Sequence, residues 1–119
     1  MDQAFWYIMD HGIATNESYP YKGNRTVESC YYVLNKKFTS FSQCAKVPSG
    51  SYSKLLSAIV QQPVSVAVNM HEDMKAFTGG VYDGNCSSIV NHGMLLTGYG
   101  GEGNGTFWKL KNTMGLDFG

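Results

Sequence analysis

The chain has 119 residues, of which 43% are apolar, and its nine basic and nine acidic residues cancel to a net charge of zero. This length and composition are typical of one globular domain with a modest core, and they give no sign of disorder. A neutral chain without a basic cluster does not attract nucleic acid or an anionic membrane, so neither is expected as a partner. The longest apolar run is far shorter than the roughly 20 residues of a membrane helix, so no membrane span is predicted.

The first residues of the chain are predicted to form a helix followed by a connector. Residues 2–11 carry apolar side chains at helical spacing, and Gly12 is a typical helix stop. Residues 16–24 are rich in turn-forming residues, and the residue before Pro20 is expected to be extended. This region therefore predicts one helix and a surface connection.

A second region, from Phe38 to Pro63, is predicted to contain a strand and a helix. Residues 38–45 alternate weakly between apolar and polar side chains, which indicates a strand. Residues 51–61 have an apolar helical face, with Ser51 or Ser53 as a possible cap, and Pro63 ends the pattern.

Three strands and a short helix are predicted after Pro63. Residues 64–68 alternate between valine and small or polar side chains, and residues 71–77 indicate a short helix. Residues 92–100 and 107–111 are apolar runs joined by a glycine-rich loop, as expected of an antiparallel hairpin. The predicted fold class is therefore α+β, built on an antiparallel sheet or a partial barrel.

His92 and Asn112 are the candidate catalytic residues. If the two last strands pair, both residues fall at the open end of the hairpin, away from the glycine-rich loop. An imidazole oriented by a side-chain amide can supply the base of a catalytic site, but not its nucleophile. A lone histidine beside an apolar strand can also be purely structural, and an asparagine at a strand end can serve only to cap a turn.

Six motifs are similar to segments of the papain-like cysteine peptidases and occur in that family's order. They are Met1-Asp2-Gln3-Ala4-Phe5, Glu17-Ser18-Tyr19-Pro20-Tyr21, Gln61-Gln62-Pro63-Val64-Ser65-Val66, Asn91-His92-Gly93, Gly98-Tyr99-Gly100 and Lys111-Asn112-Thr113. The resemblance implies a fragment of a two-lobe fold. Residues 1–34 would be the end of the helical lobe and a connector, and residues 35–119 most of the barrel-like lobe, truncated at the C-terminus.

The same resemblance implies a site chemistry. His92 would be the general base that takes the proton of a cysteine thiol, and Asn112 the amide that orients the ring. The nucleophilic cysteine would lie upstream of Met1, so the isolated chain is expected to be inactive. No cofactor or metal is implied, and three histidines at these spacings suggest no metal site.

Four residues match positions that contact substrate in the family: Met1, Ala67, Gly93 and Met114. The first three would line an apolar specificity pocket, although Ala67 and Gly93 could be small only because the core is tight. Met114 replaces a tryptophan that covers the histidine–asparagine contact in the family, and a thioether lacks the flat face and N–H of an indole. The substitution keeps a second hypothesis open, a catalytically silent relative that binds peptide or has a structural role. A third, a complete binding module of 119 residues, is the weakest.

The cysteines and the glycosylation triplets bear on the compartment. Three cysteines cannot all pair within the chain. The resemblance implies disulfides from Cys30 and Cys86 to partners outside it, and Cys44 is expected to be a small buried hydrophobic residue. Four Asn-x-Ser/Thr triplets begin at asparagines 16, 24, 85 and 104, against roughly one expected by chance. With the resemblance, they favour a lysosomal, vacuolar or secreted parent protein that carries a pro-segment and acts on peptide or protein substrates.

Overall fold

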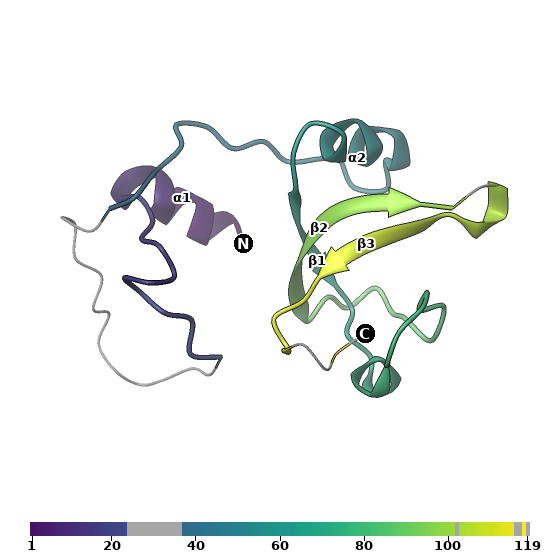
Figure 1. Ribbon diagram of the computed structural model, residues 1–119. Helices are drawn as coiled ribbons and strands as arrows, with labels where there is room; N and C mark the ends of the chain where they lie inside the picture. The colour runs from purple at the N-terminus through teal and green to yellow at the C-terminus, as the bar shows by residue number, and fades with distance from the viewer. Residues whose placement is uncertain (24–36, 102, 116–117, 119) are drawn as a thin grey trace. The chain divides into compact units, whose positions relative to one another are not determined.

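The computed structural model describes residues 1–23, 37–101, 103–115 and 118. It contains two α-helices, a three-stranded sheet and two 3-10 turns in these residues (Figure 1). The chain divides into two compact units, residues 1–46 and 47–119. The predicted lobe boundary between residues 34 and 35 lies outside the described residues.

The first unit is built around helix α1, Asp2–His11. The predicted stop is confirmed, because Gly12 adopts φ 82° and its N–H donates to the carbonyl of Ile8 at 2.8 Å. Asp2 forms a surface ion pair with Lys46 at 2.7 Å, and the pair lowers the pKa of Asp2 and raises the pKa of Lys46. Both groups are exposed, so this pair contributes little to stability.

The strand predicted over residues 38–45 is wrong. Among the described residues, this segment forms only an isolated antiparallel bridge between Thr39 and Ile13. A weak alternation of apolar and polar residues becomes a strand only where a second strand supplies a ladder of hydrogen bonds, and here the pairing stops after one bridge.

In the second unit, helix α2, Tyr52–Ile59, packs against the sheet and supplies part of the core. Ser51 occupies the N-cap position, although its side chain makes no capping hydrogen bond. The apolar face predicted from the sequence is confirmed for Ile59, which is buried, and for Leu55 and Leu56, which are half-buried, but not for Val60, which is 68% exposed. On the central strand, Leu96 is 1% exposed. Ile59 and Leu96 anchor the packing of helix against sheet.

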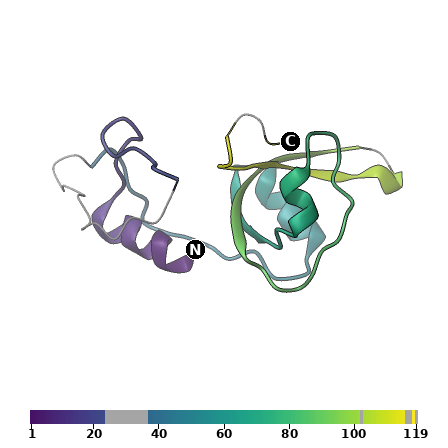
Figure 2. The ribbon, with the colours of Figure 1, turned by 90° about the horizontal axis from the view of Figure 1, so that it is seen from below.

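The sheet consists of β1 (Val64–Val68), β2 (His92–Gly100) and β3 (Phe107–Lys111), antiparallel and in that order (Figures 1 and 2). All three strands predicted after Pro63 are therefore confirmed. In β1 the valines alternate with more exposed residues, so that Val66 lies opposite Met94 and Val68 opposite His92. This register places His92 at the end of β2 that adjoins the end of β1.

Two local features shape the ends of the sheet. The pairing of β2 with β3 contains a bulge between Leu96 and Gly98, where Thr97 uses its hydroxyl to donate to the carbonyl of Lys109 at 3.1 Å. The short helix predicted at residues 71–77 is a 3-10 helix, η2, Glu72–Ala76. No helix in the described residues is long and apolar enough to cross a membrane.

Candidate active site

His92 and Asn112 meet at the open end of the β2–β3 hairpin. The imidazole Nε2 of His92 lies 2.8 Å from the Oδ1 atom of Asn112, and both side chains are partly buried. The register explains the contact. Leu95 pairs with Lys111, so the next residue, Asn112, falls opposite Met94, diagonally beside His92 on the same face of the sheet.

The backbone fixes which way the Asn112 amide faces. The N–H of Thr113 donates to the same Oδ1 atom at 2.8 Å. A flipped amide would set its NH₂ group against this N–H, donor against donor, so the oxygen must remain here. His92 therefore faces an acceptor, and its Nε2 atom must carry a proton.

The tautomer follows from this contact. A neutral imidazole with its proton on Nε2 has an unprotonated Nδ1, which is free to accept a proton. The arrangement thus presents Nδ1 of His92 as a base. Within the described residues, the Nδ2 atom of Asn112 is buried without a hydrogen-bond partner, so this amide is committed through its oxygen alone.

Two asparagines that were assigned no role from the sequence hold the segment before His92. The side chain of the first, Asn91, forms two hydrogen bonds with the backbone of Met70: it accepts from the N–H at 2.7 Å and donates to the carbonyl at 3.2 Å. The N–H of Asn91 donates to the carbonyl of Val68 at 3.0 Å. These bonds tie the start of β2 to the end of β1, directly beside the histidine.

Asn69, the second, makes the reciprocal contact. Its amide donates to the carbonyl of Ile89 at 2.7 Å and accepts from the N–H of Ser87 at 3.1 Å. The loop that leads into His92 is therefore attached to the end of β1 by side chains from both partners. The signal in the sequence was the asparagine that follows β1 and the one that precedes β2, because asparagine often bonds to nearby backbone.

A carboxylate anchors the same loop further back. Asp73, in η2, accepts from the Tyr82 hydroxyl at 2.5 Å, from the His71 ring at 2.7 Å and from the Asn85 amide at 3.3 Å. The hydrogen bond from Tyr82 is the main reason that the pKa of Asp73 falls to about 2, and the same bond raises the pKa of Tyr82 to about 12. We call these four residues the Asp73 cluster.

Of the four residues predicted to contact substrate, the structure places two, Ala67 and Gly93, side by side. Ala67 and Gly93 are cross-strand partners, and both are exposed. A Cβ atom added at Gly93 would meet nothing within 4 Å, so a tight core does not explain its small size. Because Gly93 follows His92, the two residues belong to opposite faces of β2, at the end where both faces are accessible.

The other two candidates stand apart from this pair. Met114 follows Asn112 by two residues and is 48% exposed. Met1 precedes α1 in the first unit and is 53% exposed. Since Met1 and the His92 contact belong to different units, the described geometry assigns Met1 no position at the site.

The cysteines correct one prediction. Cys44 was expected to be buried, yet it is exposed with a free thiol, because the segment around it forms no strand that a second layer could cover. Cys86 is also exposed and free. Cys30 lies outside the described residues.

This chain belongs to the papain family of cysteine proteases, because the model of that family, described as papain family cysteine protease, matches residues 1–119. Two animal relatives illustrate the similarity. Mouse cathepsin S is 38% identical over 123 residues, and a cathepsin L-like protein of Caenorhabditis elegans is 41% identical over 127 residues. Each alignment covers 100% of this chain and 36% of the relative.

Solved structures give the same result. Digestive procathepsin L 3 of the Tenebrio molitor larval midgut matches with a TM-score of 0.89 and 36% identity, over 99% of this chain and 39% of that one. Bromelain from Ananas comosus, in complex with the inhibitor E64, matches with a TM-score of 0.84 and 30% identity, over 98% of this chain and 54% of that one. The fold is that of a papain-like protease, and the chain spans between a third and about half of the length of these relatives.

Proposed function

We propose that the protein containing this chain is a cysteine endopeptidase in which His92 is the general base and Asn112 its orienting partner. The observation that supports this most strongly is the contact of His92 Nε2 with Asn112 Oδ1, together with the Thr113 N–H that fixes the amide. This arrangement leaves Nδ1 of His92 as the atom that exchanges protons.

In this mechanism His92 Nδ1 accepts the thiol proton, and the resulting thiolate–imidazolium pair is the resting form. The thiolate attacks the peptide carbonyl, and the imidazolium returns its proton to the leaving amine. A thioester then remains, which water hydrolyses with Nδ1 again as base. Throughout the cycle, Asn112 holds the Nε2 proton and so keeps the ring in one orientation.

The thiol in this proposal comes from a cysteine upstream of Met1. Cys44 and Cys86 are assigned no catalytic role, since neither lies at a helix N-terminus that would stabilise a thiolate. The 119 residues alone are therefore expected not to cleave peptides.

Substrate recognition is proposed to involve the exposed pair Ala67 and Gly93, with Met114 on the leaving-group side, whereas the role of Met1 stays a prediction from the sequence resemblance. The small side chain of Ala67 and the open space beside Gly93 leave room for an apolar side chain of the substrate, such as Leu, Val or Phe. The parent protein is proposed to carry a pro-segment and to be lysosomal, vacuolar or secreted.

A second candidate is a catalytically silent relative that binds peptide in the same cleft or has a structural role. One observation favours it: Met114 is 48% exposed and can move away, so the contact between His92 and Asn112 has no rigid aromatic cover at this position.

The two candidates are separated by labelling the natural polypeptide that contains this chain with an epoxysuccinyl peptide, which alkylates an activated thiolate. The peptidase proposal predicts modification of one cysteine upstream of Met1 and its loss in His92→Ala. Modification that is absent, or that is unchanged in His92→Ala, contradicts the peptidase proposal and favours the silent relative. Cys44→Ser is the matched control, and it should label like the unmodified protein.

A further inference from the structure

Two asparagines of the Asn-x-Ser/Thr triplets, Asn16 and Asn85, differ in what the folded chain does with their side chains. Asn16, in Asn16-Glu17-Ser18, lies in the turn after α1, and Asn85, in Asn85-Cys86-Ser87, lies in the loop before β2. Both residues are exposed. The difference concerns the amide nitrogen, which is the atom that would carry a sugar.

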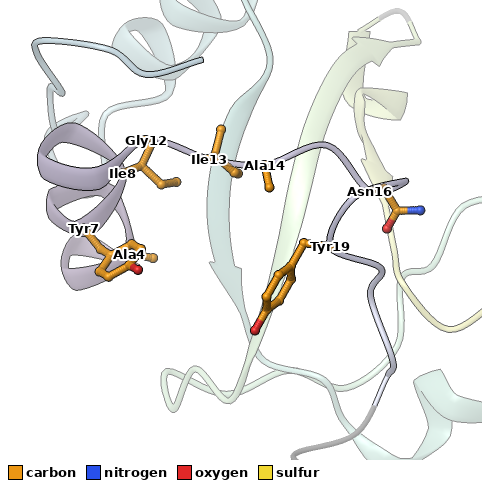
Figure 3. A pocket seen from close by; sticks show the side chains of 8 residues that line it. All are labelled: Ala4, Tyr7, Ile8, Gly12, Ile13, Ala14, Asn16 and Tyr19. Atoms are coloured by element: carbon orange, nitrogen blue, oxygen red, sulfur yellow. The ribbon is translucent and has the colours of Figure 1, made fainter. Parts of the chain in front are cut away.

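The amide nitrogen of Asn16 is available. The Oδ1 atom of Asn16 accepts from the N–H of Tyr21 at 3.0 Å, and this bond orients the side chain. Figure 3 shows the amide nitrogen directed away from the ring of Tyr19 and from the apolar hollow beside α1. Within the described residues, Nδ2 makes no hydrogen bond. A sugar on this atom would break no contact among the described residues.

The amide nitrogen of Asn85 is engaged. It donates to Asp73 at 3.3 Å, and the backbone carbonyl of Asn85 accepts from the Tyr82 hydroxyl at 3.1 Å. A sugar on Asn85 would have to fit beside the Asp73 cluster, whose hydrogen bonds attach the loop to η2. The folded chain therefore accommodates a glycan at Asn16 more readily than at Asn85.

We propose that Asn16 is N-glycosylated and that Asn85 is not. The inference rests on the secretory route in the proposed function and is independent of peptidase activity. In the reaction, Nδ2 of Asn16 forms a bond to C1 of an oligosaccharide carried on a lipid diphosphate. The bond from C1 to the phosphate oxygen breaks, the lipid diphosphate leaves, and the amide gives up one proton. No oxidation or reduction is involved.

The turn around Asn16 also sets when the transfer can occur. The Ser18 hydroxyl, which belongs to the recognised triplet, donates to the carbonyl of Thr15 at 3.2 Å and accepts from the Thr15 hydroxyl at 3.1 Å. The folded turn thus occupies the group that the transferase must contact. The modification therefore takes place before the chain folds, and the folded structure then favours the sugar at Asn16, because a sugar on Asn85 would have to fit beside the Asp73 cluster.

The test is to express the natural polypeptide that contains this chain, through the secretory route, in insect cells. The N-glycans of the secreted protein are then removed in oxygen-18 water by an amidase that hydrolyses the bond between Cγ and Nδ2 of the modified asparagine, which converts each occupied asparagine to a labelled aspartate. Peptide mapping by mass spectrometry then reports Asn16 and Asn85 separately. We expect the label at Asn16 and not at Asn85. An unlabelled Asn16 or a labelled Asn85 would overturn the proposal.

Matched variants test whether the triplet itself directs the modification. Asn16→Gln and Ser18→Ala should lose the label on this peptide, whereas Ser18→Thr, which restores a hydroxyl, should keep it. Persistence of the sugar in Ser18→Ala would contradict the assignment. Because the readout is a mass, a catalytically silent protein gives the same result, so failure here is separate from failure of the peptidase proposal.

Discussion

The Oδ1 atom of Asn112 lies 2.8 Å from the Nε2 atom of His92 and accepts the N–H of Thr113 at the same distance. One oxygen therefore serves two donors, and the backbone donor cannot be exchanged for an acceptor. The position of Asn112 at the end of the hairpin therefore determines which ring nitrogen of His92 carries the proton. In the proposed mechanism, Nδ1 of His92, and not Nε2, is therefore the base.

If the parent protein is the proposed peptidase, replacing Asn112 with alanine should lower its kcat on the order of 100-fold, because the ring is no longer held in its productive orientation. KM should change little, since Asn112 does not contact substrate in the proposed mechanism. Steady-state kinetics with a fluorogenic peptide test the split, with Lys111→Ala, on the neighbouring exposed residue, as the control. A rise in KM with unchanged kcat would contradict an orienting role.

The side-chain bonds of Asn69 should protect the loop before His92. In Asn69→Ala the N–H of Ser87 loses its acceptor, so its hydrogen exchange should accelerate, and the free energy of unfolding should fall by about 1 kcal/mol. Asn69→Asp is the informative control. It keeps the oxygen that accepts from Ser87 but loses the donor to Ile89, and so should retain protection at Ser87. Equal exchange rates in all three proteins would refute the contact.

The Asp73 cluster predicts a pH dependence. The pKa of Asp73 is lowered from 3.8 to about 2, so its stabilising effect is present above pH 4 and is lost as the pH falls towards 2. The pKa of Tyr82 is raised to about 12, so its effect is present below pH 10 and is lost as the pH rises through 12.

Tyr82→Phe should move the Asp73 pKa back towards its ordinary value, so that acid destabilisation begins at higher pH. The Asp73 carboxyl titration, followed by carbon-13 NMR, measures this directly. Tyr99→Phe is the matched control, because Tyr99 contacts Trp108 through its ring and a phenylalanine keeps that contact. A Tyr99→Phe shift as large as that of Tyr82→Phe would argue against the cluster.

The glycine-rich loop should tolerate a side chain at one glycine and not at another. Gly101 has φ 86°, and a Cβ atom there would collide with the carbonyl oxygen of Gly105. Gly101→Ala should therefore destabilise the chain by roughly 1–3 kcal/mol. Gly105 has no positive φ, and a Cβ atom added there would meet open space, so Gly105→Ala should cost less. Urea denaturation of the two variants compares them, and equal stabilities would contradict the loop geometry.

Periodic segments with a partner were predictable from the sequence. The apolar periodicity matches the element that forms in β1, in α2 and in the two strands of the hairpin, because each of these elements packs one face against a neighbour. The segment around Cys44 also alternates between apolar and polar residues, but it has no neighbouring strand to pair with beyond one bridge. Both the strand and the burial of Cys44 were therefore mispredicted.

The sequence was enough to predict that His92 and Asn112 lie together, but not the hydrogen bonds that hold them in place. The proximity of His92 and Asn112 follows from hairpin pairing. By contrast, the side-chain hydrogen bonds of Asn69 and Asn91 depend on where two loop backbones meet in space, and a local sequence pattern does not predict this. The same is true of the Thr113 N–H, since every residue except proline has one.

The most direct test of the central claim is the tautomer of His92, measured by nitrogen-15 NMR on histidine-labelled protein at a pH where the ring is neutral. The proposed mechanism requires a proton on Nε2, an unprotonated Nδ1, and a slowly exchanging Nε2 proton that becomes fast in Asn112→Ala. A neutral ring with its proton on Nδ1 would contradict it, because Asn112 Oδ1 would then face no donor from His92 and the proposed base would be the wrong atom.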